Sequence, residues 1–253
     1  MPFSIRAVFG SLAALAVMAT AAEALPRDSL WLVVRSCLGA ERLTGLPFPC
    51  VLVKAGDRTD PGYVLVRPPG ARSHVLVVPT TPIIGIEAPA LQSAQGFAYW
   101  RAALDSRRYI VDALKSRLPL SDVALAVNSK GGRSQDQLHI HLDCVDPSVR
   151  ATLDARSGLI GSKWTRLPFG LEGDHYYALR VGAMNARDFN PFAALAHLPA
   201  TRGGLSATSL AVVATSPNDP HPGFYILAYQ APRAHAEALL DHQCEIASQV
   251  AKR

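Results

Sequence analysis

The stretch NSKGGRSQDQLHIHLDC, residues 128–144, decides how this chain folds. The apolar residues at positions 138, 140 and 142 alternate with polar ones, and this alternation predicts a half-buried β-strand. The other face of that strand then carries Gln137, His139, His141 and Asp143. Two imidazoles are therefore expected to stand side by side on one surface of a sheet.

The loop just before this strand is rich in groups that attract anions. It holds two adjacent glycines together with Lys130 and Arg133. A glycine-containing turn can aim backbone amides at an anion, and the two cations add charge. The loop therefore predicts a phosphate site beside the histidines.

The residues alone leave three interpretations of the histidine pair open. The two rings can be a packed, hydrogen-bonded pair without chemistry. They can be metal ligands, in which case Asp143, Cys144 or Asp146 has to complete the site. One neutral imidazole can instead attack phosphorus while its neighbours fix its tautomer, and only this interpretation uses every polar group of the stretch.

The order Asn128, Gln135, His139, His141 resembles the signature of the histidine triad (HIT) hydrolases and transferases. A second piece, His74 followed by four apolar residues and a proline, is similar to another strand of that superfamily. The resemblance implies an α+β fold, a HIT-like antiparallel sheet with flanking helices. It also implies that His141, the middle position of the triad, is the nucleophile.

Two departures from the superfamily narrow the resemblance. Asp143 stands at the third triad position, and Ser134 stands where glycine commonly precedes the glutamine. Residues 128–141 resemble the hallmark of a branch with these changes, the CDP-diacylglycerol pyrophosphatases, as do residues 85–89 and 241–245. The implied reaction cleaves CDP-diacylglycerol to CMP and phosphatidate through a cytidylyl-histidine, without a metal or other cofactor.

The resemblance and the chemistry together suggest a role for each polar group. His139 and His74 are expected to orient the phosphate or to donate to its oxygens, and Asp143 to raise the basicity of a neighbour. Developing charge on the phosphoryl group needs preorganised donors. The expected substrate-binding residues are Asn128, Lys130, Arg133, Gln135, Gln137 and Asp143, and His175 is an outside candidate for the site.

Other functions compete with this hypothesis. A related enzyme could act on soluble nucleoside diphosphate derivatives as a nucleotidyl hydrolase or transferase. A metal-binding β-barrel of the cupin type also uses alternating histidines, and a periplasmic binding module without catalysis is a third alternative.

The N-terminus predicts export. Residues 1–24 combine Arg6, an apolar run over 7–22 and small residues before a cleavage point after Ala24, so they read as a signal peptide or an N-terminal anchor. Residues 25–253 are then one domain on the periplasmic side of the inner membrane. The net charge of +5 suits an anionic lipid substrate and a membrane surface, and no basic stripe with interleaved aromatics indicates nucleic acid.

All four cysteines follow the expected cleavage point. An even number in an exported chain indicates disulfides, although three pairings are possible. Cys37 and Cys50 are close in sequence and flank a turn-rich segment, which favours this pair and therefore also the pair Cys144 and Cys244.

Hydrophobic periodicity and turn residues predict the remaining elements. Helices are expected over 29–38, 90–118, 147–156 and 191–198, and from Pro232 to near the C-terminus. Strands are expected over 50–53, 63–66, 74–78, 123–127, 163–167, 176–181, 210–215 and 224–229. The late strands suggest a second sheet half packed against the first, which could stand in for the partner of a HIT dimer, in a monomer or a homodimer.

Overall fold

The computed structural model describes residues 26–57, 60–115, 117–199 and 203–250. The expected signal or anchor, residues 1–24, lies outside them. The described residues form one antiparallel sheet of ten strands in the order β1-β2-β3-β5-β4-β8-β9-β7-β6, with β10 paired to β5 off this path. The strands are β1 (Leu52–Lys54), β2 (Tyr63–Val66), β3 (Val75–Pro79), β4 (Val123–Val127), β5 (Ile140–Val145), β6 (Thr165–Arg166), β7 (Tyr177–Gly182), β8 (Thr208–Ala214), β9 (Gly223–Gln230) and β10 (Leu240–Asp241).

The C-terminal strands extend this sheet. Strand β8 pairs antiparallel with β4, with Leu125 opposite Val212 and Val127 opposite Leu210. The expectation of a second sheet half packed against the first is therefore wrong, because the two halves join edge to edge. The two strands that meet here, β4 and β8, are buried along their whole length and consist mainly of small and branched apolar residues. Such strands can form hydrogen bonds side by side within one sheet as readily as they pack face to face between two sheets.

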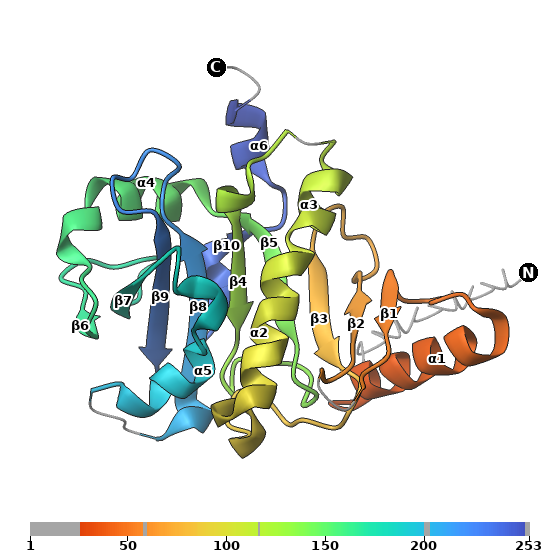
Figure 1. The fold of residues 1–253 in the computed structure, drawn as a ribbon. Coiled ribbons are helices and arrows are strands. Elements are labelled where there is room, and N and C mark those ends of the chain that lie inside the picture. Colours follow the sequence, from red (N-terminus) through yellow and green to blue (C-terminus); the bar gives the residue numbers. More distant parts are fainter. Residues whose placement is uncertain (1–25, 58–59, 116, 200–202, 251–253) are drawn as a thin grey trace, which may run out of the picture.

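Helices pack on both faces of the sheet, since Trp100 belongs to the large core on one face and Leu30 and Val34 to a small core on the other. Figure 1 shows α2 lying across β3, β5 and β4 and α5 beside it over β8, while α1 lies at the other end of the sheet. The helices are α1 (Ser29–Thr44), α2 (Ala94–Ser106), α3 (Arg108–Ala113), α4 (Pro147–Ala155), α5 (Pro191–Ala194) and α6 (Glu245–Val250). No helix among these described ranges is long and apolar enough to cross a bilayer.

The register of β5 decides which face the histidines use. Residues directly opposite each other in an antiparallel pair point to the same side, and His141 lies opposite Leu76 of β3. Leu76 packs in a small core with Leu30 and Val34 of α1. The histidines therefore share the face of α1, while their strand neighbour Leu142 belongs to the large core under α2.

The predicted helix over 90–118 is interrupted in the structure. Residues 89–92 form a short 3₁₀ turn, and Ser93 then adopts an extended conformation and caps α2 by accepting a hydrogen bond from the amide of Gln95. Helix α2 ends at Ser106 and α3 at Ala113. The apolar stripe is continuous, so periodicity alone could not reveal the restarts.

The predicted C-terminal helix from Pro232 is also wrong. The segment contains a 3₁₀ turn, Ala236–Leu239, then β10, and α6 begins only at Glu245. Pairing of β10 with β5 holds the backbone extended. Both predicted disulfides, Cys37–Cys50 and Cys144–Cys244, are present, and the second ties this segment to β5.

Candidate active site

His141 lies at the centre of a buried cluster of imidazoles and carboxylates. Its Nδ1 is 3.0 Å from Oε1 of Glu237 and 3.1 Å from Nε2 of His74. The three residues come from separate segments: His141 lies on β5, His74 precedes β3, and Glu237 lies in the turn before β10. The fold thus assembles the cluster on one face of the sheet from distant parts of the sequence.

Glu237 is the hub of this cluster. Its Oε1 also accepts from His242, at 3.1 Å, and its Oε2 accepts from Asn128, at 2.9 Å. Burial acts to raise the pKa of Glu237, but hydrogen bonds from His141, His235 and His242 outweigh it and hold this pKa far below the usual range. Because the ionised carboxylate only accepts, Nδ1 of His141 carries the proton of their hydrogen bond.

His242 is held between two carboxylates. Its Nδ1 is 2.8 Å from Oδ2 of Asp143 and its Nε2 faces Glu237. The hydrogen bonds to Asp143 and then Glu237 raise the pKa of His242 to about 9, so the ring is an imidazolium at neutral pH. Asp143, which we expected to raise the basicity of a neighbour, contacts His242 and is the largest cause of its raised pKa.

His74 and His139 are neutral by contrast. Burial, followed by the nearby rings of His141 and His242, lowers the pKa of His74 to about 3. Burial and the nearby ring of His141 lower the pKa of His139 to about 4, and Nδ1 of His139 is 2.7 Å from the carbonyl of Gln137. The rings of His139 and His141 meet edge to face with centroids 4.8 Å apart, which fixes their planes.

The second nitrogen of His141 has no partner. Nε2 is buried and makes no hydrogen bond to the described residues. Buried polar atoms are seldom left unpaired, so an orphan at such a position points to a role in chemistry or binding. In the neutral ring with its proton on Nδ1, Nε2 carries a lone pair.

Other predicted site residues have structural partners. Arg133 is buried and forms two 2.7 Å hydrogen bonds to Glu87, although its Nε is unpartnered. Gln135 accepts from the amide of Leu30 and so fixes the start of α1, and Gln137 bonds backbone groups near the end of β3. Among the predicted cations of the loop, Lys130 is exposed.

The glycine-containing loop is used differently from expectation. The amides of Ser129, Lys130 and Arg133 donate to carbonyl groups of the protein, as does that of Gly132. A Cβ on Gly131 or Gly132 would collide with the carbonyl oxygen of Pro232 or Ala234. The glycines therefore let the C-terminal segment lie against the loop, where the side chain of Asn128 bonds both the amide and the carboxylate of Glu237.

Sequence reasoning missed Glu237 and His242 as site residues. Glu237 had no motif around it, because it lies in a segment that periodicity predicts as helix. A signal for His242 existed: the predicted bridge Cys144–Cys244 places it near Asp143. His175, the outside candidate, lies in another hollow with Arg166 and Tyr229 and is not part of the cluster.

Three sets of donor atoms among the described residues have the proximity that a metal ion needs, but the cysteines of one, Asp143 with Cys144 and Cys244, are bonded to each other. The ligand atoms of His74, His141 and Glu237 lie within 4.8 Å of one another, and so do those of His74, Asp143 and His242. Hydrogen bonds already join members of both sets, and a metal would have to displace the proton on Nδ1 of His141. The donor set therefore fits a proton-linked network better than an ion site.

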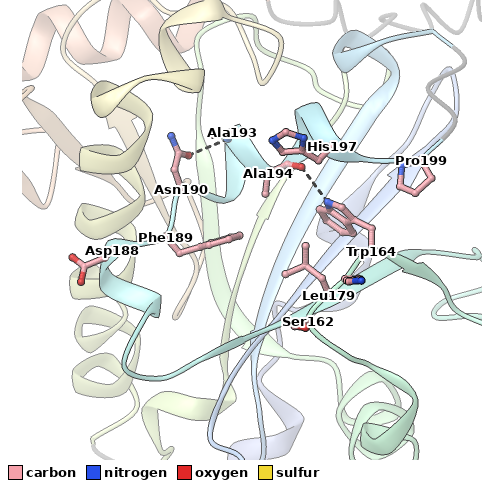
Figure 2. Close-up of a pocket in the computed structure, with 11 residues that line it drawn as sticks. Ser162, Trp164, Leu179, Asp188, Phe189, Asn190, Ala193, Ala194, His197 and Pro199 are labelled. Atoms are coloured by element: carbon pink, nitrogen blue, oxygen red, sulfur yellow. Dashed lines mark hydrogen bonds between the residues drawn. The ribbon is translucent and has the colours of Figure 1, made fainter.

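A cavity of about 640 Å³ lies away from this cluster (Figure 2). Figure 2 shows Trp164 and Leu179 facing Ala193 and Ala194 of α5 across it. Leu179, which lines this cavity, points to the face of the sheet opposite His141. The register shows this, because a row of directly opposite residues on neighbouring strands runs from Leu179 through Ile226, Val212 and Leu125 to Leu142, the strand neighbour of His141. A substrate that reacts at His141 cannot occupy this cavity, since the sheet separates them.

A histidine whose Nδ1 is held by a half-buried carboxylate and whose Nε2 has no hydrogen-bond partner among the described residues is an arrangement suited to hydrolytic chemistry. Comparison with known proteins agrees and specifies the reaction: the model of the CDP-diacylglycerol pyrophosphatase family matches residues 25–248. The CDP-diacylglycerol pyrophosphatase of Yersinia pestis is 32% identical over 226 residues, which cover 87% of this chain and 84% of that protein. The chain belongs to the CDP-diacylglycerol pyrophosphatase family and is a CDP-diacylglycerol diphosphatase.

Proposed function

We propose that this enzyme releases CMP and phosphatidate through a cytidylyl-histidine on His141. Nε2 attacks the phosphorus that bears cytidine, and the bond from this phosphorus to the bridging oxygen breaks. Phosphatidate leaves with the electron pair of that bond. Water then attacks the same phosphorus and releases a proton to solvent, and CMP departs as the electron pair of the bond to phosphorus returns to Nε2, which restores His141.

The observation that carries this proposal is the pairing of His141 with Glu237. Phosphorylation of Nε2 while Nδ1 keeps its proton gives the ring a positive charge. The carboxylate 3.0 Å away neutralises that charge as it develops, and it was already in place before the reaction. Neutral His74 adds no competing cation at Nδ1.

Lys130, Arg133 and Gln135 remain proposed ligands of the phosphate or nucleotide. Of these, exposed Lys130 is the most available, because Glu87 compensates the charge of Arg133 and Gln135 is bonded to α1. Nε2 of His141 is covered, so entry of the phosphoryl group requires the atoms above it to shift.

Export to the periplasmic side of the inner membrane is part of the proposal. Residues 1–24 read as a signal or an anchor. Two disulfides are consistent with an oxidising compartment.

The test is to trap the intermediate with labelled CDP-diacylglycerol and to map the modified residue by mass spectrometry under conditions that preserve phosphoramidates. The label should appear on His141, and His141→Ala should neither be labelled nor turn over substrate. Label at another residue, or near-normal turnover by His141→Ala, would overturn the mechanism. CDP-choline in the same assay tests the alternative of soluble nucleoside diphosphate substrates, which predicts equal turnover without lipid.

A further inference from the structure

Helix α1 presents apolar side chains on the side that faces away from the sheet. Its residues Leu30, Val34 and Cys37 are buried in the small core. Leu32 lies two positions from both Leu30 and Val34, and at about 100° per residue that spacing points it outward. Leu43 follows eleven positions later, about three turns on, and therefore lies on the same outer side as Leu32.

The loop after α1 continues this apolar surface. The exposed fractions are 55% for Leu32, 87% for Leu43, 63% for Leu46 and 76% for Phe48. These four account for half of the eight exposed large apolar residues in the described ranges, yet they fall within seventeen positions. A soluble surface scatters such residues singly, so their concentration on one helix and loop indicates an interaction site.

Two arginines give this surface a positive charge, and a disulfide holds its shape. Arg35 and Arg42 are exposed on the same helix. The Cys37–Cys50 disulfide closes the unit from α1 to the end of the loop. An apolar helix face that is flanked by arginines and held by a disulfide fits an anionic lipid surface. The apolar side chains would lie at the boundary of the acyl chains and the guanidinium groups at the phosphates.

This unit is attached directly to the catalytic face. The amide of Leu30 donates to Gln135 at 2.8 Å, and Arg27, just before α1, forms a 2.7 Å ion pair with Asp136. Leu76, on which α1 packs, lies opposite His141 in the sheet. A surface that holds α1 therefore also fixes the distance and orientation of the histidine cluster.

We propose that Leu32, Leu43, Leu46 and Phe48, with Arg35 and Arg42, form a docking face that rests on an anionic phospholipid bilayer. The substrate of this family is itself a lipid that resides in a bilayer, so the enzyme has to reach its headgroup at that surface. The inference rests on the family's activity and not on the identity of the nucleophile. It assigns membrane contact to a folded surface rather than to the N-terminal apolar run alone.

The decisive experiment compares two double substitutions in the full chain. L43D/F48D places charges on the docking face, and L159D/M184D places the same charges at other exposed apolar positions, which are 54% and 93% exposed. Each variant is assayed on CDP-diacylglycerol in phosphatidylglycerol vesicles and on a short-chain CDP-diacylglycerol dissolved as monomers. L43D/F48D should lose roughly tenfold or more on vesicles and keep its turnover of the soluble substrate, while L159D/M184D should keep both.

Equal activity of the two variants on vesicles would overturn the docking face. If L43D/F48D also fails on the soluble substrate, the unsubstituted chain decides: vesicles with a photoreactive group in the acyl chain should label residues 32–48. Labelling confined to other described segments would contradict the proposal. The His141 mechanism is tested separately, because His141→Ala should lose turnover of both substrates while its labelling by the vesicles is unchanged. Retained turnover in His141→Ala would overturn that mechanism and leave the docking face untouched.

Discussion

At the scale of single residues, the cluster holds neutral histidines, a cationic histidine and an anionic glutamate in direct contact. His74 and His139 are neutral because they are buried, whereas His242 is cationic because two carboxylates hold it. Glu237 is anionic because three histidines donate to it, even though it is partly buried. Nδ1 of His141 faces this anion, while its Nε2 has no hydrogen-bond partner among the described residues.

Glu237→Gln tests the carboxylate. The amide keeps the size of the side chain but removes the charge that balances the phosphorylated ring. We expect kcat to fall on the order of 10²-fold or more with KM little changed. The matched control is His235→Gln, which removes an exposed partner of Glu237 and should leave kcat near normal. Full kcat in purified Glu237→Gln would remove this residue from the mechanism.

His242 predicts a pH dependence of stability. Its pKa is raised from 6.5 to about 9 on folding, so the folded state binds more protons than the unfolded state between these values. Its stabilisation is therefore complete below pH 6.5 and is lost as the pH rises toward 9. The urea midpoint should fall between pH 6.5 and 9 more in the wild type than in His242→Gln, with His221→Gln, at an exposed position, behaving like the wild type. Parallel pH profiles for all three would show that the two carboxylates do not hold the ring.

At the scale of elements, the C-terminal segment from Pro232 to Cys244 completes the cluster of histidines and carboxylates around His141. It is neither helix nor free loop: the glycines at 131 and 132 make room for it, β10 joins it to β5, and Cys244 bonds to Cys144. The remaining cluster members lie on or beside strands. The segment therefore determines whether Glu237 and His242 reach His141.

Removal of the Cys144–Cys244 bridge should reduce catalysis more than removal of the other bridge. The first closes a separation of 100 residues and the second only 13, so the first also restricts the unfolded chain more. C144A/C244A should lose turnover of the short-chain substrate, while C37A/C50A should retain it. Thermal melting followed by circular dichroism checks that both variants are folded. Equal turnover by the two variants would show that the segment stays in place without its clamp.

At the scale of the whole molecule, one hydrophobic core passes through both sequence halves. It includes Val75 and Ile140 from the first strands together with Phe192 and Tyr225 from the later part. The seam between β4 and β8 crosses the middle of the sheet with no break in pairing. The two halves should therefore not unfold independently.

This continuity predicts one cooperative transition. Circular dichroism and tryptophan fluorescence should report the same urea midpoint. Ala211→Asp, which buries a charge at the seam, should lower both midpoints together, whereas Ala196→Asp at an exposed position should leave them unchanged. Two separate transitions would show that the late strands form an autonomous unit.

The sequence predicted strands better than it predicted their partners. Strand β4 occupies residues 123–127 as expected, and the alternation in 138–142 correctly assigned His139 and His141 to one face, because strand periodicity is local. The pairing of β4 with β8 depends on contacts between remote residues, and no local pattern encodes it. The same limit hid Glu237, whose role exists only because the backbone from Pro232 onward packs against a loop a hundred residues earlier.

The distribution of the cluster along the chain affects what a proteolytic nick would do to it. His74 precedes β3 and His141 lies on β5, whereas Glu237, His242 and Cys244 all follow β9. A cut between β9 and β10 would leave the Cys144–Cys244 bridge and the pairing of β10 with β5 to hold the C-terminal fragment on the sheet. We therefore expect the cluster to survive such a cut under oxidising conditions and to come apart when the bridge is reduced.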